Sequence, residues 1–164
     1  MPGIFLRIIS VSYRCSVQIS LPIAGSRAKT ATKMKVFLIE KSIPIRTRLK
    51  ATVEELGGSV VGEASTHEDV IAEIGEAKPH ILLIDLSMVE GNGPAILRRV
   101  KLAQPDIIIV VFTDYVSPQY QRVCILSGAD FFIEKAADYL VLVSLLESLR
   151  GVICSSTGGT TSEA

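Results

Sequence analysis

Five short apolar runs, separated by segments of helical periodicity, constrain the fold of this chain more than any other feature. The runs are rich in Val, Ile, Leu and Phe, which is typical of β-strands. Three of them are apolar at nearly every position, as expected for parallel strands that are covered on both faces. The expected strands are residues 35–39, 59–64, 80–84, 107–112 and 130–134.

The intervening segments carry apolar residues at helical spacing, preceded by residues that start helices and followed by glycines that end them. The start signals are Ser42, Thr66 with Asp69, Pro94, Ser117 with Pro118, and Asp138; the stop signals are Gly57, Gly58 and Gly128. The expected core faces are Ile45, Leu49, Val53 and Leu56; Val70, Ile71 and Ile74; Ile96, Leu97 and Val100; Val123, Ile125 and Leu126; and Leu142, Leu146 and Leu149.

This regular alternation predicts an α/β fold with parallel strands, right-handed crossovers and helices on both faces of one sheet. We expect a doubly wound, five-stranded parallel sheet of the flavodoxin-like type, with strand order 2-1-3-4-5. That order places a switch point beside the first strand, where ligands bind in such sheets.

The two ends differ in composition from the centre, and we expect one domain over residues 34–150. Residues 1–33 hold five basic and no acidic residues, whereas 34–150 hold 12 basic and 16 acidic ones. The N-terminal segment is interrupted by arginines, which argues against a signal peptide. We expect it to lie outside the functional product or to be a disordered extension, and a transit-like or membrane-surface segment is a weaker reading. Residues 151–164 are expected to be a flexible tail.

Composition also limits the partners and the location of the protein. The mildly acidic centre argues against direct nucleic-acid binding, which needs a basic face. The longest apolar runs are about six residues, far short of the roughly 20 that cross a bilayer. We therefore expect no membrane partner. Three separated cysteines indicate reduced thiols in a cytoplasmic protein.

Charged or hydroxyl residues follow four of the five expected strands. Glu40 and Lys41 follow the first strand, Asp85 the third, Thr113 and Asp114 the fourth, and Glu134 and Lys135 the last. A single case is ordinary at a strand end. Because the carboxyl ends of parallel strands meet at one edge, four cases together indicate a site.

These residue types suit the transfer of a phosphoryl group. The Asp85 carboxylate is a candidate nucleophile that would form an acyl phosphate. Lys135 and Thr113 could hold phosphoryl oxygens, and Glu40 with Asp85 could bind Mg²⁺ through oxygen ligands. Phosphoryl transfer depends mainly on positioning and on charge stabilisation, so little further machinery is needed.

Three motifs in order resemble those of the receiver domains of two-component response regulators, over essentially all of residues 34–150. ILLIDLSMVEGNG is similar to the phosphoacceptor strand and loop, with Asp85, Met88 and Gly93 at the family's spacing. VVFTDY resembles the strand of the conserved hydroxyl at Thr113, and GADFFIEK resembles the last strand, with Phe132 at the switch aromatic and Lys135 as the family lysine.

The resemblance implies a signalling module without substrate turnover, phosphorylated on Asp85 by a histidine kinase or phosphotransfer protein. It implies that Mg²⁺ lies between Glu40, Asp85 and the backbone carbonyl of Ser87. Phosphorylation would move Thr113 towards the acyl phosphate and repack Phe132. The switch face would be the helix after Ser117, the strand 130–134 and the last helix.

Lys41 is the main departure, because the family has two adjacent acidic residues where this chain has Glu40-Lys41. An ammonium about 4 Å from a cation opposes its binding by roughly 4 kcal/mol at an effective dielectric of 20. Lys41 could instead replace the cation by pairing with Asp85, or turn into solvent and leave a weak metal site.

Three smaller departures concern the loops and the switch. Val89 and Ala136 replace prolines common in the family, and a cis bond before Ala136 would cost about 3 kcal/mol. Phe132 lacks the hydroxyl of a tyrosine. It could be permanently buried, or it could pack as a tyrosine would at this position.

The surface residues suggest partner contacts. Tyr115, Tyr120 and Arg122 fall on the predicted switch face, through which a homodimer could also form. Glu90 and Asn92 follow the third strand, where they could contact the kinase or the site. His67 and His80 have no identified partner.

Two main functions and one weaker reading follow. The first is a stand-alone receiver, without an output domain after residue 150, that signals by protein–protein contact under control of Asp85. The second is a degenerate receiver, an interaction module independent of phosphorylation because of Lys41. A small enzyme or nucleotide-binding domain is the weaker reading, since the chain has no GxGxxG after the first strand and no GxxxxGK[ST].

Overall fold

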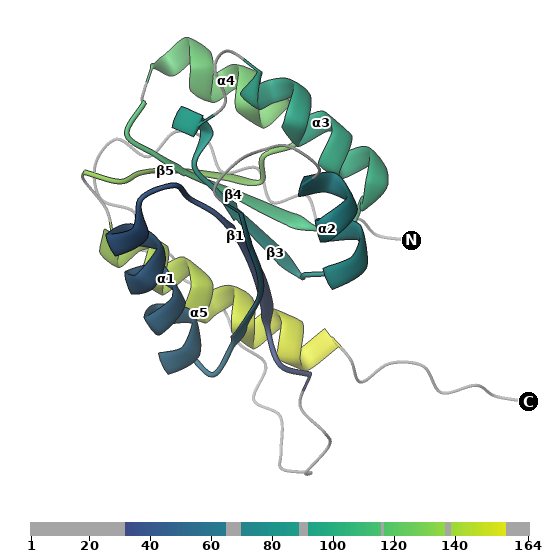
Figure 1. Ribbon diagram of the computed structural model, residues 1–164, viewed down its shortest axis with the longest axis vertical. Helices are drawn as coiled ribbons and strands as arrows, with labels where there is room; N and C mark the ends of the chain where they lie inside the picture. The colour runs from purple at the N-terminus through teal and green to yellow at the C-terminus, as the bar shows by residue number, and fades with distance from the viewer. Residues whose placement is uncertain (1–31, 65–69, 89–91, 116, 137–138, 157–164) are drawn as a thin grey trace, which may run out of the picture. The chain divides into compact units, whose positions relative to one another are not determined.

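The expected strands form one parallel sheet with the order β2-β1-β3-β4-β5 (Figure 1). The computed structural model describes residues 32–64, 70–88, 92–115, 117–136 and 139–156. The strands are β1 (Lys35–Ile39), β2 (Ser59–Ala64), β3 (Ile81–Ile84), β4 (Ile108–Thr113) and β5 (Phe131–Glu134). The predicted fold class and strand order are therefore confirmed.

Helices cover both faces of the sheet, two on one side and three on the other (Figure 1). They are α1 (Ile43–Glu55), α2 (Val70–Ala77), α3 (Gly93–Ala103), α4 (Pro118–Leu126) and α5 (Tyr139–Ser156), with a short 3₁₀ turn, η1 (Leu86–Met88), after β3. α1 and α5 lie on one face, and α2, α3 and α4 lie on the other, as right-handed crossovers at both sides of a switch point require.

The period of two along the strands divides the core into two layers, because successive side chains point to opposite faces. Leu38, Leu83 and Val110 pack with α1 and α5, whereas their neighbours Ile39 and Ile84 pack with α2, α3 and α4. This is why β1, β3 and β4 are apolar at nearly every position. β2 and β5 form the edges, and most of their side chains are half-buried.

Two of the expected helix starts have different outcomes. Ser117 caps α4 as predicted, because its Oγ accepts a hydrogen bond from the backbone N–H of Tyr120 at 3.1 Å. Ser42 occupies the expected N-cap position of α1, but its side chain makes no capping hydrogen bond. The Ser42 backbone N–H instead donates to a carboxylate oxygen of Glu40 at 2.8 Å. The expected cap at Thr66 with Asp69 lies outside the described residues.

The core face expected for α4 was wrong. Val123, Ile125 and Leu126 are all exposed, Leu126 by 74%, and Cys124 is the fully buried residue of this helix. The helix has nine residues, so a shift of one position turns a different stripe to the sheet. In α1, α2, α3 and α5 the expected apolar residues are buried or half-buried.

The last helix is longer than expected. α5 continues through Ser156, past residue 150, where we placed the end of the domain. The expectations for residues 1–31, for the final residues from 157, and for His67, Val89 and Glu90 lie outside the described residues. Among the helices that the structure describes, none has the length and hydropathy needed to cross a membrane.

Candidate functional site

Four polar side chains meet at the carboxyl edge of the sheet, each at the end of a different strand. Glu40 follows β1, Asp85 follows β3, Thr113 ends β4 and Lys135 follows β5. Backbone hydrogen bonds continue one residue past the strands, from Asp85 N to Ile39 O at 2.8 Å and from Lys135 N to Thr113 O at 3.0 Å. The sheet itself therefore fixes the backbone from which the side chains project.

A buried ammonium joins the two carboxylates. Lys135 Nζ lies 2.6 Å from Asp85 Oδ2 and 2.5 Å from Glu40 Oε2, and all three side chains are at most 7% exposed. Charge-assisted hydrogen bonds of this length are among the strongest in proteins. Because removing charges from water is costly, the group is stable only while all three members remain paired.

The remaining carboxylate oxygens are also occupied. Asp85 Oδ1 accepts from the backbone N–H of Ser87 at 2.9 Å, and Asp85 Oδ2 accepts from the Ser87 hydroxyl at 2.6 Å. Glu40 Oε1 accepts from the Ser42 backbone N–H at 2.8 Å. Sequence reasoning assigned Ser87 only a backbone carbonyl and missed its side chain. A serine two residues after an aspartate is a local side-chain-to-backbone turn signal that could have revealed it.

Burial and hydrogen bonding have opposite effects on the pKa values of Asp85 and Lys135. Burial by itself would raise the pKa of Asp85, but hydrogen bonds from Lys135 and Ser87 outweigh it and hold the pKa below its usual value. Burial likewise works to lower the pKa of Lys135, while the bonds to Asp85 and Glu40 raise it above the usual value. Asp85 is therefore a carboxylate at neutral pH and Lys135 an ammonium, the states that a nucleophile and a phosphoryl-binding cation require.

Thr113 is fully buried beside this group. Its Oγ1 accepts a hydrogen bond from the backbone N–H of Tyr115 at 3.3 Å, and its hydroxyl has no hydrogen bond to Asp85. Phe132, on β5, is half-buried against the core under α2, α3 and α4. Thr113 thus lies at the end of β4, and Phe132 lies on β5 three positions before Lys135.

Comparison with known proteins places this arrangement in a family. Residues 36–147 match the family described as the response regulator receiver domain. The chain belongs to this family. The match spans every strand from β1 to β5 and therefore includes all four strand ends that carry the site.

Relatives and solved structures agree with the assignment. The chain is 30% identical over 106 residues to the DNA-binding transcriptional activator DevR/DosR of Mycobacterium tuberculosis, covering 62% of this chain and 48% of that protein. It is 28% identical over 120 residues to the response regulator GacA of Pseudomonas aeruginosa, covering 73% and 55%. The chain thus spans about half the length of these relatives.

A CheY-like receiver domain from Methanospirillum hungatei has the same fold. Its crystal structure aligns with a TM-score of 0.67 at 19% identity, covering 78% of this chain and all of that one. At this identity the likeness concerns the fold.

Lys41 takes no part in the charged group of this receiver. It is exposed, and it has no hydrogen bond or ion pair with any described residue. Of the two expectations for this side chain, solvent exposure agrees with the structure, and pairing with Asp85 does not. Lys135 occupies the position beside Asp85 because β5 ends at the same edge as β3.

Magnesium is the ion that receiver domains typically bind at the phosphorylation site, so the residues here can be tested for fit. No group of three acidic, histidine or cysteine side chains suitable for a metal occurs within the described residues. Every oxygen of Glu40 and Asp85 is already hydrogen-bonded, two of them to the ammonium of Lys135. A divalent cation would have to displace that ammonium, so the residues as arranged do not fit Mg²⁺.

The expected partner face is only partly open. Tyr115 is 62% exposed and Arg122 is exposed, whereas Tyr120 is half-buried and packs edge-on against Tyr115 with ring centroids 5.1 Å apart. Burial raises the pKa of Tyr120 to about 12, and the nearby Cys124 side chain contributes to this shift to a smaller extent. Tyr120 therefore packs against Tyr115 and is less accessible, while Tyr115 and Arg122 are accessible to a partner.

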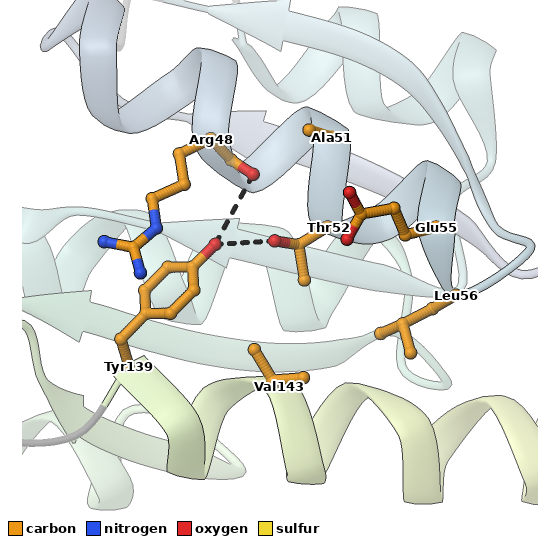
Figure 2. A pocket seen from close by; sticks show the side chains of 7 residues that line it. All are labelled: Arg48, Ala51, Thr52, Glu55, Leu56, Tyr139 and Val143. Carbon is orange, nitrogen blue, oxygen red and sulfur yellow. Dashed lines mark hydrogen bonds between the residues drawn. The ribbon is translucent and has the colours of Figure 1, made fainter.

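The hollow drawn in Figure 2 lies elsewhere, between α1 and α5. Its volume is about 370 Å³. The Tyr139 hydroxyl meets Thr52 Oγ1 at 2.6 Å, and the Arg48 guanidinium lies 3.7 Å above the Tyr139 ring (Figure 2). Sequence reasoning did not identify this cluster, because its members come from distant helices and form no motif. Its contacts join α1 to the start of α5.

Proposed function

We propose that this receiver accepts a phosphoryl group on Asp85 from a histidine kinase or phosphotransfer protein and passes the signal on through protein–protein contact. One observation carries the proposal: a buried ammonium, Lys135, is held against an ionised aspartate at the carboxyl edge of the sheet. A structural ion pair needs no such position at the strand ends. Perturbed ionisable groups gathered at a ligand-binding edge are characteristic of functional sites.

The reaction balances with a phosphohistidine as donor. An Asp85 carboxylate oxygen forms a bond to phosphorus while the bond between phosphorus and the donor's imidazole nitrogen breaks. That nitrogen keeps the electron pair and takes up a proton. Because Asp85 is already ionised, no base is needed to activate it. Lys135 can then hold a phosphoryl oxygen as a point charge, and Thr113 can donate a hydrogen bond to another.

The change in charge at Asp85 would supply the switch. The Lys135 ammonium is shared between Asp85 and Glu40 before the reaction. If it moves to bind a phosphoryl oxygen, its bond to Glu40 becomes weaker. Reorientation of Thr113 would release the backbone N–H of Tyr115, which now donates to its hydroxyl. Tyr115 packs on Tyr120, so the change would reach α4 and Phe132 on β5, the surface proposed for partner contact or homodimerisation.

The proposal is tested by comparing Asp85→Asn with the parent chain, using phosphoramidate as a small donor and intact mass spectrometry as the readout. Asp114→Asn is the matched control, because Asp114 is an exposed aspartate at the end of the neighbouring strand. The parent and Asp114→Asn should gain the mass of one phosphoryl group, and Asp85→Asn should not. Equal incorporation into Asp85→Asn would overturn the proposal.

A phosphorylation-independent interaction module is a second candidate. It is favoured by the complete hydrogen bonding of Glu40 and Asp85 in the unmodified site and by the presence of Lys41. It predicts that beryllofluoride, a phosphoryl mimic, leaves the amide NMR spectrum of the chain unchanged. Shifts at Thr113 and along α4 would exclude this candidate and support the first one.

Location and further partners stay predictions. A cytoplasmic location and the absence of direct nucleic-acid contact rest on composition. The absence of substrate turnover rests on the general character of receiver domains. The curated relatives extend well beyond the length of this chain, and several of them are named as transcriptional regulators.

A further inference from the structure

Four charged groups around Asp85 balance one another, while Asp114 and Glu134 at the ends of β4 and β5 add two negative charges to this edge. Glu40 and Asp85 each contribute one negative charge, and Lys41 and Lys135 each contribute one positive charge, so their formal charges sum to zero. Three of the four groups form the buried cluster, while Lys41 is exposed and unpaired among the described residues. A divalent cation approaching Asp85 would meet the Lys135 ammonium between its two carboxylate ligands and would have to displace it.

We propose that Lys41 and Lys135 together compensate the charge of a phosphoryl group on Asp85, so that this receiver accepts the group without a divalent cation. The inference rests on the proposed phosphorylation of Asp85 and specifies how the site would do it. Lys135 would serve the buried side of the phosphoryl group and Lys41 the solvent side.

The negative charge of a phosphoryl group on Asp85 is more than one lysine can offset. Asp85 carries one negative charge before the reaction and about two afterwards, on the terminal phosphoryl oxygens. Lys135 offsets one charge, and Glu40 continues to compete for it at 2.5 Å. Lys135 alone therefore leaves one of the two phosphoryl charges without a cationic partner, and a second ammonium would supply it.

Lys41 is the residue placed to supply that charge. It follows Glu40 directly at the end of β1, and β1 pairs with β3 so that Ile39 lies opposite Ile84, the residue before Asp85. Its ammonium is on a flexible four-carbon stem and gives up no existing ion pair to a described residue when it moves. Its exposure also places it where a phosphodonor must approach.

The first experiment measures phosphorylation of the full chain by phosphoramidate in EDTA and in Mg²⁺, with intact mass spectrometry as the readout. The variants are Lys41→Gln and Lys41→Asp. Lys33→Gln is the matched control, since Lys33 is an exposed lysine just before β1, at the opposite end of that strand. Because both lysines are exposed, the substitutions should leave the fold intact, which an amide NMR spectrum verifies.

The parent and Lys33→Gln should be modified in EDTA about as fast as in Mg²⁺. Lys41→Gln should be roughly tenfold slower in EDTA, the effect of removing one nearby positive charge. Lys41→Asp should be modified only with Mg²⁺. Modification of the parent only with Mg²⁺ would overturn this inference and leave the proposed function intact. No modification in either buffer would overturn both.

A second readout does not depend on phosphoryl transfer. Mg²⁺ is titrated into the unmodified full chain, and amide shifts at Asp85 and Ser87 are followed. The parent should show no saturable shift at millimolar Mg²⁺, whereas Lys41→Asp should bind the ion at least tenfold more tightly. Equal affinity of the two proteins for Mg²⁺ would contradict the role assigned to Lys41.

Discussion

The hydroxyl of Ser87 donates to Asp85 Oδ2 at 2.6 Å, on the same oxygen that accepts the ammonium of Lys135. One carboxylate oxygen thus carries two strong hydrogen bonds, while the other is held by the Ser87 backbone N–H. The serine fixes the orientation of the proposed phosphoacceptor from within its own loop. It also contributes to keeping the carboxyl ionised.

Ser87→Ala should raise the pKa of Asp85 towards its usual value. The substitution removes the hydroxyl bond to the charged form and leaves the backbone bond and Lys135 in place. A ¹³C NMR titration of the Asp85 carboxyl carbon measures the change. Ser127→Ala is the control, because it removes a hydroxyl far from this carboxylate in the chain, and a shift of equal size in both variants would contradict the role of Ser87.

Lys135→Met should lower the free energy of unfolding by about 3–5 kcal/mol at pH 7, because it leaves two buried carboxylates unpaired. The loss should shrink in acid. The folded pKa of Asp85 is depressed, so its contribution is present above the unfolded value of 3.8 and disappears as the pH falls through the folded pKa. Urea unfolding between pH 3 and pH 7 measures both quantities. An equal loss at all pH values would show that the effect is packing and not charge.

Tyr139 and Thr52 should be energetically coupled by about 1 kcal/mol, the usual net value of a hydrogen bond between side chains. Tyr139→Phe and Thr52→Val each remove one partner of the 2.6 Å bond and keep the shape of the side chain. A double-mutant cycle on urea unfolding measures the coupling. Additive single effects would mean that the two hydroxyls do not hold α1 and α5 together.

Ser127→Ala should leave stability unchanged or raise it by up to about 1 kcal/mol. The Ser127 hydroxyl is buried and has no hydrogen-bond partner within the described part of the chain, so its desolvation is not compensated. Thermal unfolding provides the comparison, with the melting temperature expected at or above that of the parent. A clear loss of stability would contradict this prediction and show that the Ser127 hydroxyl makes a stabilising contact.

Much of the fold was predictable because the deciding signals are local. Runs apolar at nearly every position indicated β1, β3 and β4 as strands covered on both faces, and the burial of most of their side chains agrees. α4 shows the limit of such signals. Its nine residues carry apolar side chains on several sides, and only packing of Cys124 against the sheet decided which stripe is buried.

The site shows the same division between sequence and structure. The order of residues along the chain determined that Glu40, Asp85, Thr113 and Lys135 end strands at one edge, since parallel strands place every carboxyl end together. The sequence could not decide which of two lysines neutralises Asp85, because Lys41 and Lys135 have the same chemistry and both follow strands. The tertiary structure decided it: the end of β5 places Lys135 within hydrogen-bond distance of both carboxylates, whereas Lys41 is exposed to solvent.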